Sequence, residues 1–296
     1  MINMNKSFTL IEILVVIVVI GVLSAFILVG MSSITSSANI ARGKAFLNSM
    51  DNSLLLSRVS QWKLDEAVGS GTASDSWGTN TGTLSGTAPL AQFQTTGCTS
   101  NNCLSFDGND YIDLGLPTAI TSLQQGSVSM WFKPTTDITN EKPLFHIRGT
   151  VPSAQYVILE YRSSKLKIDN GAAGSCQGNT TLQLNTWYNV VYASNGSTWN
   201  IYLNGIAETL TKSGTDGCWF GDVVTPSSLS IGGYATSIFH TGLMDDVRIY
   251  NQAIPTSKIQ QSYFVGLNNL YKNKGLTQLE YSQRIVELKN NLVQSN

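Results

Sequence analysis

A long apolar run near the N-terminus constrains this chain more than any other feature. From Ile13 to Met31 every residue is apolar or small except Ser24, and this length is close to the ~20 residues that an α-helix needs to cross a bilayer. One carboxylate, Glu12, lies at the N-terminal edge of the run. A carboxylate in hydrocarbon costs about 2.5–3.5 kcal/mol at the bilayer centre and less at the edge, so chains keep one where it has a partner. The run therefore predicts a membrane-spanning helix with a functional acidic group at its start.

The residues around Glu12 resemble the signature of type IV pilins and type II secretion pseudopilins. Lys6 and Ser7 are followed by Phe8-Thr9-Leu10-Ile11-Glu12. The resemblance implies that residues 1–7 are a leader, that a prepilin peptidase cuts between Ser7 and Phe8, and that the new α-amine is methylated. The family usually has Gly before the cut, whereas this chain has Ser7.

In that family the acidic residue five positions into the mature chain pairs with the N-terminal amine of a neighbouring subunit, which implies an assembly role for Glu12. An α-amine with a pKa of about 7.7–8.0 is cationic at neutral pH, and burying a charge pair costs far less than burying one charge alone. Two other interpretations are open, an uncleaved signal anchor and a cleaved secretory signal. The apolar core exceeds the about 7–15 residues of an ordinary signal, and no convincing A-x-A exit follows it.

The helix is predicted to continue past the membrane. Apolar residues recur at spacings of three and four, which indicates one face of a helix; they are Ile34, Ala38, Ala41, Ala45, Phe46, Met50 and Leu54. We expect one helix over residues 8–60, ending near Val59, with its first half in the membrane or filament core.

From residue 62 to residue 254 the pattern changes to short strands. Val128, Met130 and Phe132 alternate with smaller or polar neighbours, which is typical of half-buried strands. Asn-Gly pairs, as at Asn204-Gly205, indicate tight hairpin turns because such turns need positive φ. The fold class is therefore mainly β, an antiparallel sandwich with a long N-terminal helix and a short helical tail.

A series of short motifs in this region resembles laminin G-like, concanavalin A-type jelly rolls. The motifs come in the family's order and begin at Trp62, Asp75, Leu104, Ser129, Trp187, Ile201 and Met244. The resemblance implies a jelly-roll head over residues 62–254, and carbohydrate binding as the family's common use.

Residues 255–296 are predicted to form a helical tail. Ile259, Tyr263, Leu267 and Tyr271 mark a first helix that ends near Lys274-Gly275. Thr277-x-x-Glu280 is a capping box, which predicts a second helix to about residue 292. Leu279, Ile285 and Leu288 are its expected apolar face.

The four cysteines are Cys98, Cys103, Cys176 and Cys218. An even number beyond a membrane anchor favours two disulfides, and four cysteines allow three pairings. We favour Cys98–Cys103 and Cys176–Cys218; four free thiols or a metal site are the alternatives.

Calcium is the cofactor that the jelly-roll resemblance implies, held by carboxylate, amide and backbone oxygens. Asp245 has the same strand parity as Val247 and Ile249, so it is expected to face inward, where a bare carboxylate is costly. The resemblance places the loop of Asp75 and Asn80 near that last strand. We therefore predict a structural Ca²⁺ site at Asp75, Asn80 and Asp245; a second acidic cluster follows at Asp107, Asn109 and Asp110.

Tryptophans and paired carboxylates are the residues that would carry sugar binding or catalysis in such a head. Trp77, Trp131, Trp199 and Trp219 are candidate sugar platforms, and Trp131 is out of phase with its apolar neighbours. No E-x-D-x-x-E run of the glucanase type is present, so paired acid and base carboxylates are missing and we expect no enzyme. Charged residues make up 12% of the chain and the net charge is −1, so we expect no nucleic-acid partner.

These features together predict a pilin or pseudopilin subunit of a type IV pilus or type II secretion filament, with a lectin-like adhesive head. Its expected partners are other pilin subunits, a prepilin peptidase, the membrane, and a carbohydrate or surface protein. It would be a single-pass membrane protein with the head outside the cytoplasm, and lie in a surface filament after assembly. The alternative is a membrane-anchored lectin-like protein that does not assemble, for which Glu12 has no role.

Overall fold

The structure, a computed structural model, describes residues 56–150, 155–171, 173–234 and 238–294. Residues 57–296 form one compact unit. Ser7, Phe8, Glu12 and the predicted membrane-spanning segment lie outside the described residues. Within the described ranges no helix is long and apolar enough to cross a membrane.

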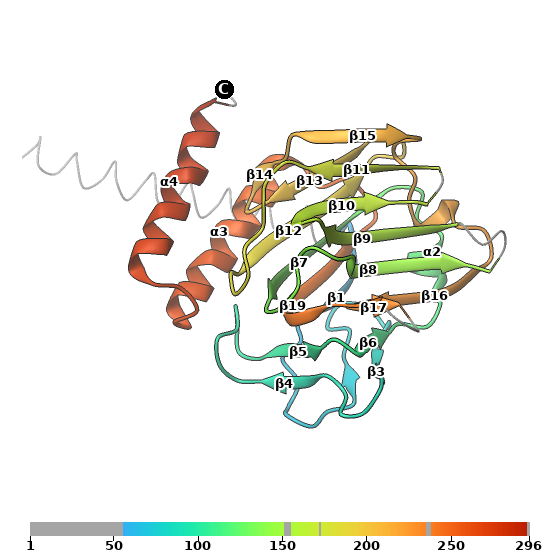
Figure 1. Cartoon of the computed structure of the whole chain (residues 1–296), viewed down its shortest axis with the longest axis horizontal. Helices are drawn as coiled ribbons and strands as arrows, with labels where there is room; N and C mark the ends of the chain where they lie inside the picture. Colours follow the sequence, from blue (N-terminus) through green and yellow to red (C-terminus); the bar gives the residue numbers. More distant parts are fainter. Residues whose placement is uncertain (1–55, 151–154, 172, 235–237, 295–296) are drawn as a thin grey trace, which may run out of the picture. The chain divides into compact units, whose positions relative to one another are not determined.

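The described part of the head is mainly β and consists of two large antiparallel sheets that face each other as a jelly-roll-like sandwich (Figure 1). The first sheet has the order β14-β13-β12-β7-β19-β5-β4, and β1 pairs with β19 beside this path. Its strands are β1 (Arg58–Trp62), β4 (Gln92–Gln94), β5 (Cys103–Asp107), β7 (Gly126–Pro134), β12 (Tyr188–Ser194), β13 (Trp199–Leu203), β14 (Ile206–Ala207) and β19 (Thr241–Tyr250). We call it the eight-stranded sheet.

The second sheet has the order β15-β11-β10-β9-β8-β16-β6-β3-β2, and we call it the nine-stranded sheet. Its strands are β2 (Thr72–Ala73), β3 (Gly82–Gly86), β6 (Asp110–Asp113), β8 (Lys142–Gly149), β9 (Tyr156–Arg162), β10 (Lys165–Asp169), β11 (Gly174–Gly178), β15 (Leu210–Gly214) and β16 (Pro226–Ile231). A small hairpin, β17 (Gly233–Tyr234) and β18 (Ile238–Phe239), follows β16, and two short helical turns are α2 (Thr118–Thr121) and η1 (Phe220–Asp222).

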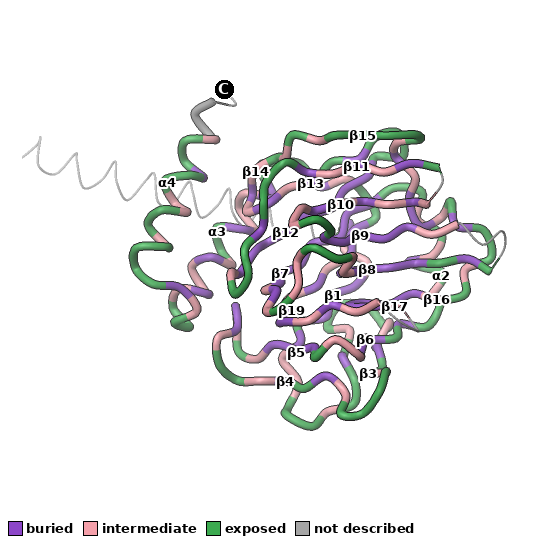
Figure 2. The backbone as a smooth tube through the Cα atoms, viewed as in Figure 1, coloured by how far each residue is buried: buried purple, intermediate pink, exposed green. Residues whose placement is uncertain are grey.

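The core lies between the two sheets, as the buried stretches in Figure 2 indicate. Val128, Met130 and Phe132 of β7 all belong to this core, as their alternation predicts. The Asn204-Gly205 turn also forms as predicted: it joins β13 to β14, and both residues have positive φ. Local sequence patterns therefore predict the alternation of β7 and this hairpin correctly.

The predicted helix end near Val59 is wrong, because β1 begins at Arg58. Arg58 is aligned with Tyr250, and Trp62 with Val247, in an antiparallel ladder with the last strand. Trp62 is fully buried, and its indole Nε1 donates a 2.8 Å hydrogen bond to the carbonyl of Asn80. The head therefore starts at about residue 57, several residues earlier than predicted.

The tail forms two helices, α3 (Thr256–Lys272) and α4 (Gln278–Gln294), beside the eight-stranded sheet (Figure 1). Tyr263 of α3 stacks on Trp131 of β7 with ring centroids 5.7 Å apart. Gly266 lies so close to the Trp131 ring that an added Cβ would be 2.6 Å from it. This apolar contact covers the part of the outer face around Trp131 and Leu243.

The capping box at the start of α4 forms as predicted. The Thr277 backbone N–H donates to the Glu280 carboxylate over 2.8 Å, and the Glu280 N–H donates to the Thr277 hydroxyl over 3.2 Å. The predicted apolar face of this helix is partly wrong. Leu288 is buried and Ile285 packs against the same cluster, but Leu279 is 67% exposed.

Candidate functional site

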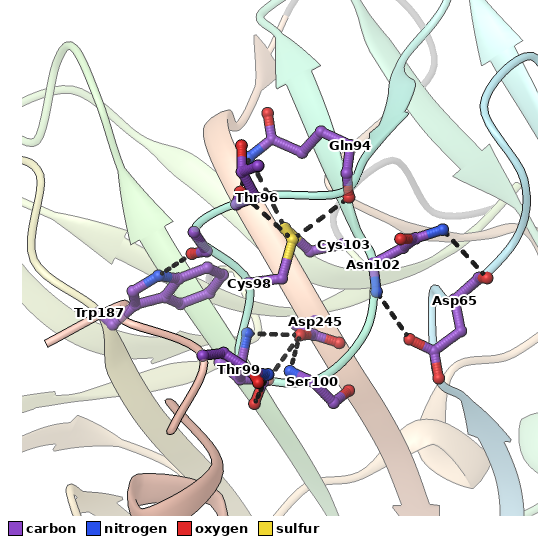
Figure 3. The surroundings of a disulfide bond; sticks show 12 residues. Asp65, Gln94, Thr96, Cys98, Thr99, Ser100, Asn102, Cys103, Trp187 and Asp245 are labelled. Atoms are coloured by element: carbon purple, nitrogen blue, oxygen red, sulfur yellow. Dashed lines mark hydrogen bonds between the residues drawn. A yellow bond between two sulfur atoms is a disulfide. The ribbon is translucent and has the colours of Figure 1, made fainter. Parts of the chain in front are cut away.

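A small disulfide loop lies against the outer face of the eight-stranded sheet (Figure 3). Cys98 and Cys103 are joined, with their Cα atoms 5.4 Å apart. The Trp187 indole Nε1 donates a 2.7 Å hydrogen bond to the carbonyl of Gly97, and the Asn102 N–H donates to Asp65 over 3.1 Å. These contacts hold the loop in place from both sides.

Asp245 binds the same loop. One of its carboxylate oxygens accepts hydrogen bonds from the Thr99 hydroxyl, the Thr99 N–H and the Ser100 N–H, at 2.5, 2.9 and 3.1 Å (Figure 3). The other oxygen has no hydrogen-bond partner within the described part of the chain. Burial raises the pKa of Asp245 well above its ordinary value, and the Thr99 hydroxyl partly opposes that shift.

The expectation that Asp245 faces the core is wrong, although the residue is fully buried. The register between β19 and β7 shifts between Asp245 and Arg248, and Asp246 has a φ of 50°. This bulge moves one residue out of alternation. Met244 and Val247 therefore both face the core, while Asp245 contacts the disulfide loop on the other face.

Asp75 lies in a different environment. Its carboxylate accepts hydrogen bonds from the backbone N–H groups of Gln61, Trp77, Gly78 and Asn80, at 2.8–3.1 Å. Burial alone would raise the pKa of Asp75, but the four N–H donors together outweigh it and lower that pKa.

Asp75 and Asn80 lie together, since the Asn80 N–H donates to the Asp75 carboxylate over 3.1 Å, whereas the Asp245 carboxylate contacts Thr99 and Ser100 of the disulfide loop. Gln61 links the Asp75 loop to Asp246, since its backbone N–H donates to Asp75 and its side chain donates to Asp246 over 2.8 Å. The described residues contain no group of three or more His, Cys, Asp or Glu side chains that could hold a metal ion. Calcium at Asp75, Asn80 and Asp245 stays a prediction.

The second predicted disulfide is not formed: Cys176 and Cys218 are free thiols. Cys176 of β11 is fully buried and aligned with Ile168 on one side and Lys212 on the other. Burial raises its pKa to about 12, so the thiol is protonated and unreactive at neutral pH.

Most of the predicted sugar platforms belong to the interior. Trp199 and Trp219 are fully buried in the core, and Trp131 faces outward as its phase indicates but is covered by α3. Trp77 is 43% exposed, but the Arg58 guanidinium lies 4.9 Å above its ring. Of these four tryptophans, Trp77 is the one whose ring is partly accessible to a ligand.

Two buried carboxylates were not predicted as a group from the sequence. Asp110 of β6 and Glu160 of β9 are fully buried, and within the described ranges none of their four carboxylate oxygens has a hydrogen-bond partner. Burial, reinforced by the charge of Asp107, raises the pKa of Asp110 to about 7. Burial, reinforced by Glu141, raises the pKa of Glu160 to about 8. Because both pKa values are raised in the folded chain, we expect the free energy of unfolding of the head to fall as the pH rises.

Two cavities near β6 and the β17–β18 hairpin were not predicted from the sequence. Tyr111 of β6 stacks on Phe239 of β18 with centroids 6.3 Å apart, and each ring lines a cavity of about 380 Å³. The motif that begins at Leu104 and contains Tyr111 predicts the jelly-roll fold but not a binding site. The pairing with Phe239 joins residues 128 positions apart in the chain and has no local signal.

Comparison with protein families agrees with the fold and with the N-terminal pattern. Residues 106–260, more than half of the chain, match the model described as concanavalin A-like lectin/glucanases superfamily, and the chain belongs to this superfamily. Residues 2–28 match the prokaryotic N-terminal methylation motif. No curated protein sequence gives a significant match.

Solved structures show the same fold at low sequence identity. One is domain 4 of AbnA, a GH43 extracellular arabinanase from Geobacillus stearothermophilus, in complex with arabinotriose. It is 20% identical with a TM-score of 0.54, covering 69% of this chain and 97% of that one. Another is Trypanosoma rangeli sialidase in complex with the inhibitor DANA, 14% identical with a TM-score of 0.53. That match covers 70% of this chain and 32% of the sialidase.

Proposed function

We propose that this protein is a subunit of a type IV pilus or type II secretion filament and that its head binds carbohydrate. The observation that carries the proposal is the order of parts in one chain: a methylation motif at residues 2–28 precedes a concanavalin A-like domain. The motif supports processing by a prepilin peptidase and assembly with other pilins. The fold supports a lectin-like role for the head, although a fold alone does not determine a ligand.

The N-terminal chemistry supports assembly over a simple anchor. Glu12 stands at the edge of the apolar run, where a carboxylate is costly without a cationic partner. In an assembled filament that partner is the α-amine of Phe8 in a neighbouring subunit. A non-assembling membrane-anchored lectin has no use for this group.

A binding role is also favoured over catalysis in the head. The adjacent acids of the last strand have separate structural contacts, since Asp245 holds the disulfide loop and Asp246 pairs with Arg248 at 2.6 Å. Within the described residues, the hydrogen bonds and ion pairs of Asp245 and Asp246 thus serve structural contacts rather than an acid–base pair of carboxylates.

The test is to replace Glu12 by Ala and to collect filaments by shearing. We expect the variant to insert in the membrane with a folded head but to be absent from the filament fraction. Glu287→Ala, which removes an exposed acid of α4, is the matched control and should assemble normally. Mass spectrometry of the mature protein should show an N-methylated Phe8, and an intact Met1 or normal assembly of the Glu12 variant would reject the filament role.

A further inference from the structure

Two cavities adjoin a stacked aromatic pair, and each is lined by one of its two rings. The rings of Tyr111 and Phe239 stack at 25° to each other. Tyr111 lines the first cavity together with Asp113, Ser227 and Ser228. Phe239 lines the second, so each ring of the stacked pair borders one cavity. We call this arrangement the Tyr111–Phe239 groove.

Strand alternation builds the first cavity. Ile112 of β6 and Leu229 of β16 belong to the core between the sheets, so their neighbours Tyr111, Asp113 and Ser228 face the opposite side. The first cavity therefore offers a partly exposed ring, a carboxylate and hydroxyl groups.

The loop between β7 and β8 builds the second cavity. Asp137 accepts hydrogen bonds from the backbone N–H groups of Thr139 and Asn140 over 2.8 and 3.2 Å. The hydroxyl of Thr139 holds the pKa of Asp137 well below its ordinary value, so this carboxylate is ionised at neutral pH. Its position is fixed before any ligand arrives.

The charges of the second cavity are balanced in pairs. The Lys142 Nζ lies 4.0 Å from Asp137, and the Arg162 Nη1 lies 3.5 Å from Glu141. The first cavity adds a carboxylate, Asp113, and among the described residues that line it there is no cation. Each cation that lines the second cavity therefore has a carboxylate beside it, whereas the carboxylate of Asp113 has no cation among the described residues that line the first cavity.

This set of groups fits a sugar without charge. An aromatic face packs against the C–H face of a sugar ring, carboxylates accept hydrogen bonds from hydroxyls, and amide and guanidinium groups donate them. Each cavity falls within the about 300–1,000 Å³ that is usual for small-molecule sites. Anionic sugars would meet the carboxylates of Asp113 and Asp137, and this repulsion selects against them.

We propose that the Tyr111–Phe239 groove binds a neutral glycan that spans the aromatic pair, with sugar units in both cavities. The proposal rests on the carbohydrate-binding role of the head and specifies its ligand class and its site.

The test is affinity electrophoresis of the full chain in non-ionic detergent. The gels contain one of four neutral polysaccharides (arabinan, xylan, mannan or β-glucan) or the anionic polygalacturonate. We expect retardation by at least one neutral polysaccharide and none by polygalacturonate. Tyr111→Ala and Phe239→Ala should weaken binding at least tenfold, whereas Tyr111→Phe should keep it. Phe264→Ala, which removes an exposed ring of α3, is the matched control and should bind like the wild type.

A second variant distinguishes loss of binding from loss of folding. Ser228→Trp should fill the first cavity from a partly exposed position without disturbing the core, and unfolding curves check each variant. The groove is overturned if no neutral polysaccharide retards the protein, if only polygalacturonate does, or if folded Tyr111→Ala and Ser228→Trp bind like the wild type. Filament assembly is measured separately, so binding that persists in these variants rejects the groove but not the filament role.

Discussion

Replacing Glu160 by Gln should remove a large part of the pH dependence of this head. Glu160 lies on β9 between Leu159 and Tyr161, which both face the core. Its own side chain is on the opposite face, fully buried, and the Lys167 Nζ lies 4.0 Å from its Oε1. That amine also pairs with Asp169, so it only partly compensates the carboxylate. Burial therefore dominates and raises the pKa of Glu160 to about 8 from an ordinary 4.5.

The sign of the effect follows from proton linkage. The folded chain keeps the Glu160 proton up to a pH of about 8, whereas the unfolded chain releases it near pH 4.5. Unfolding between these values releases a proton, so the free energy of unfolding falls as the pH rises. One proton corresponds to about 1.4 kcal/mol per pH unit. From pH 5 to pH 8 the contribution of Glu160 should fall by roughly 3 kcal/mol.

The assay is urea unfolding of the purified chain in non-ionic detergent, followed by tryptophan fluorescence at pH 5, 6, 7 and 8. Glu160→Gln should lose about 3 kcal/mol less stability than the wild type over this range, because Asp110 and Asp245 titrate in both proteins. Glu287→Gln, an exposed acid, should follow the wild type. If wild type and Glu160→Gln run parallel within about 0.5 kcal/mol from pH 5 to pH 8, the burial argument is wrong.

Three further predictions concern the disulfide loop, calcium and the start of the head. Replacing Cys98 and Cys103 together by Ser should lower the free energy of unfolding by about 2 kcal/mol, because the bond closes a loop with a sequence separation of 5. Denaturant unfolding measures this free energy, and an unchanged midpoint would contradict the prediction. If Asp75, Asn80 and Asp245 hold Ca²⁺, calcium at a hundredfold excess over Kd should stabilise the head by about 2.7 kcal/mol. Asp245→Asn should abolish this gain. Identical melting curves with calcium and with chelator would show that the head has no such calcium site. A chain that starts at Ser57 should fold and one that starts at Lys63 should not, since the latter lacks β1 and the buried Trp62; circular dichroism distinguishes them, and equal spectra and melting points would show that β1 is dispensable.

The sequence by itself determined the features that depend on neighbours in the chain. The Thr277 and Glu280 capping box, the Asn204-Gly205 hairpin and the core alternation of β7 all formed as their local patterns predict. Each rests on backbone geometry or hydrogen bonds within a few residues. The methylation motif and the superfamily are likewise recognisable from the residues alone, because both are ordered sets of short motifs.

Only the tertiary structure decided the features that depend on distant segments. The bulge after Asp245 comes from its register with β7 and turns that carboxylate from the core to the disulfide loop. Trp131 is covered because α3, more than a hundred residues later, packs on it. The start of β1 is set by pairing with β19, and the Tyr111–Phe239 groove by two strands that meet in space. Residue types and local spacing carry no signal for such contacts, because pairing and coverage depend on where the chain returns.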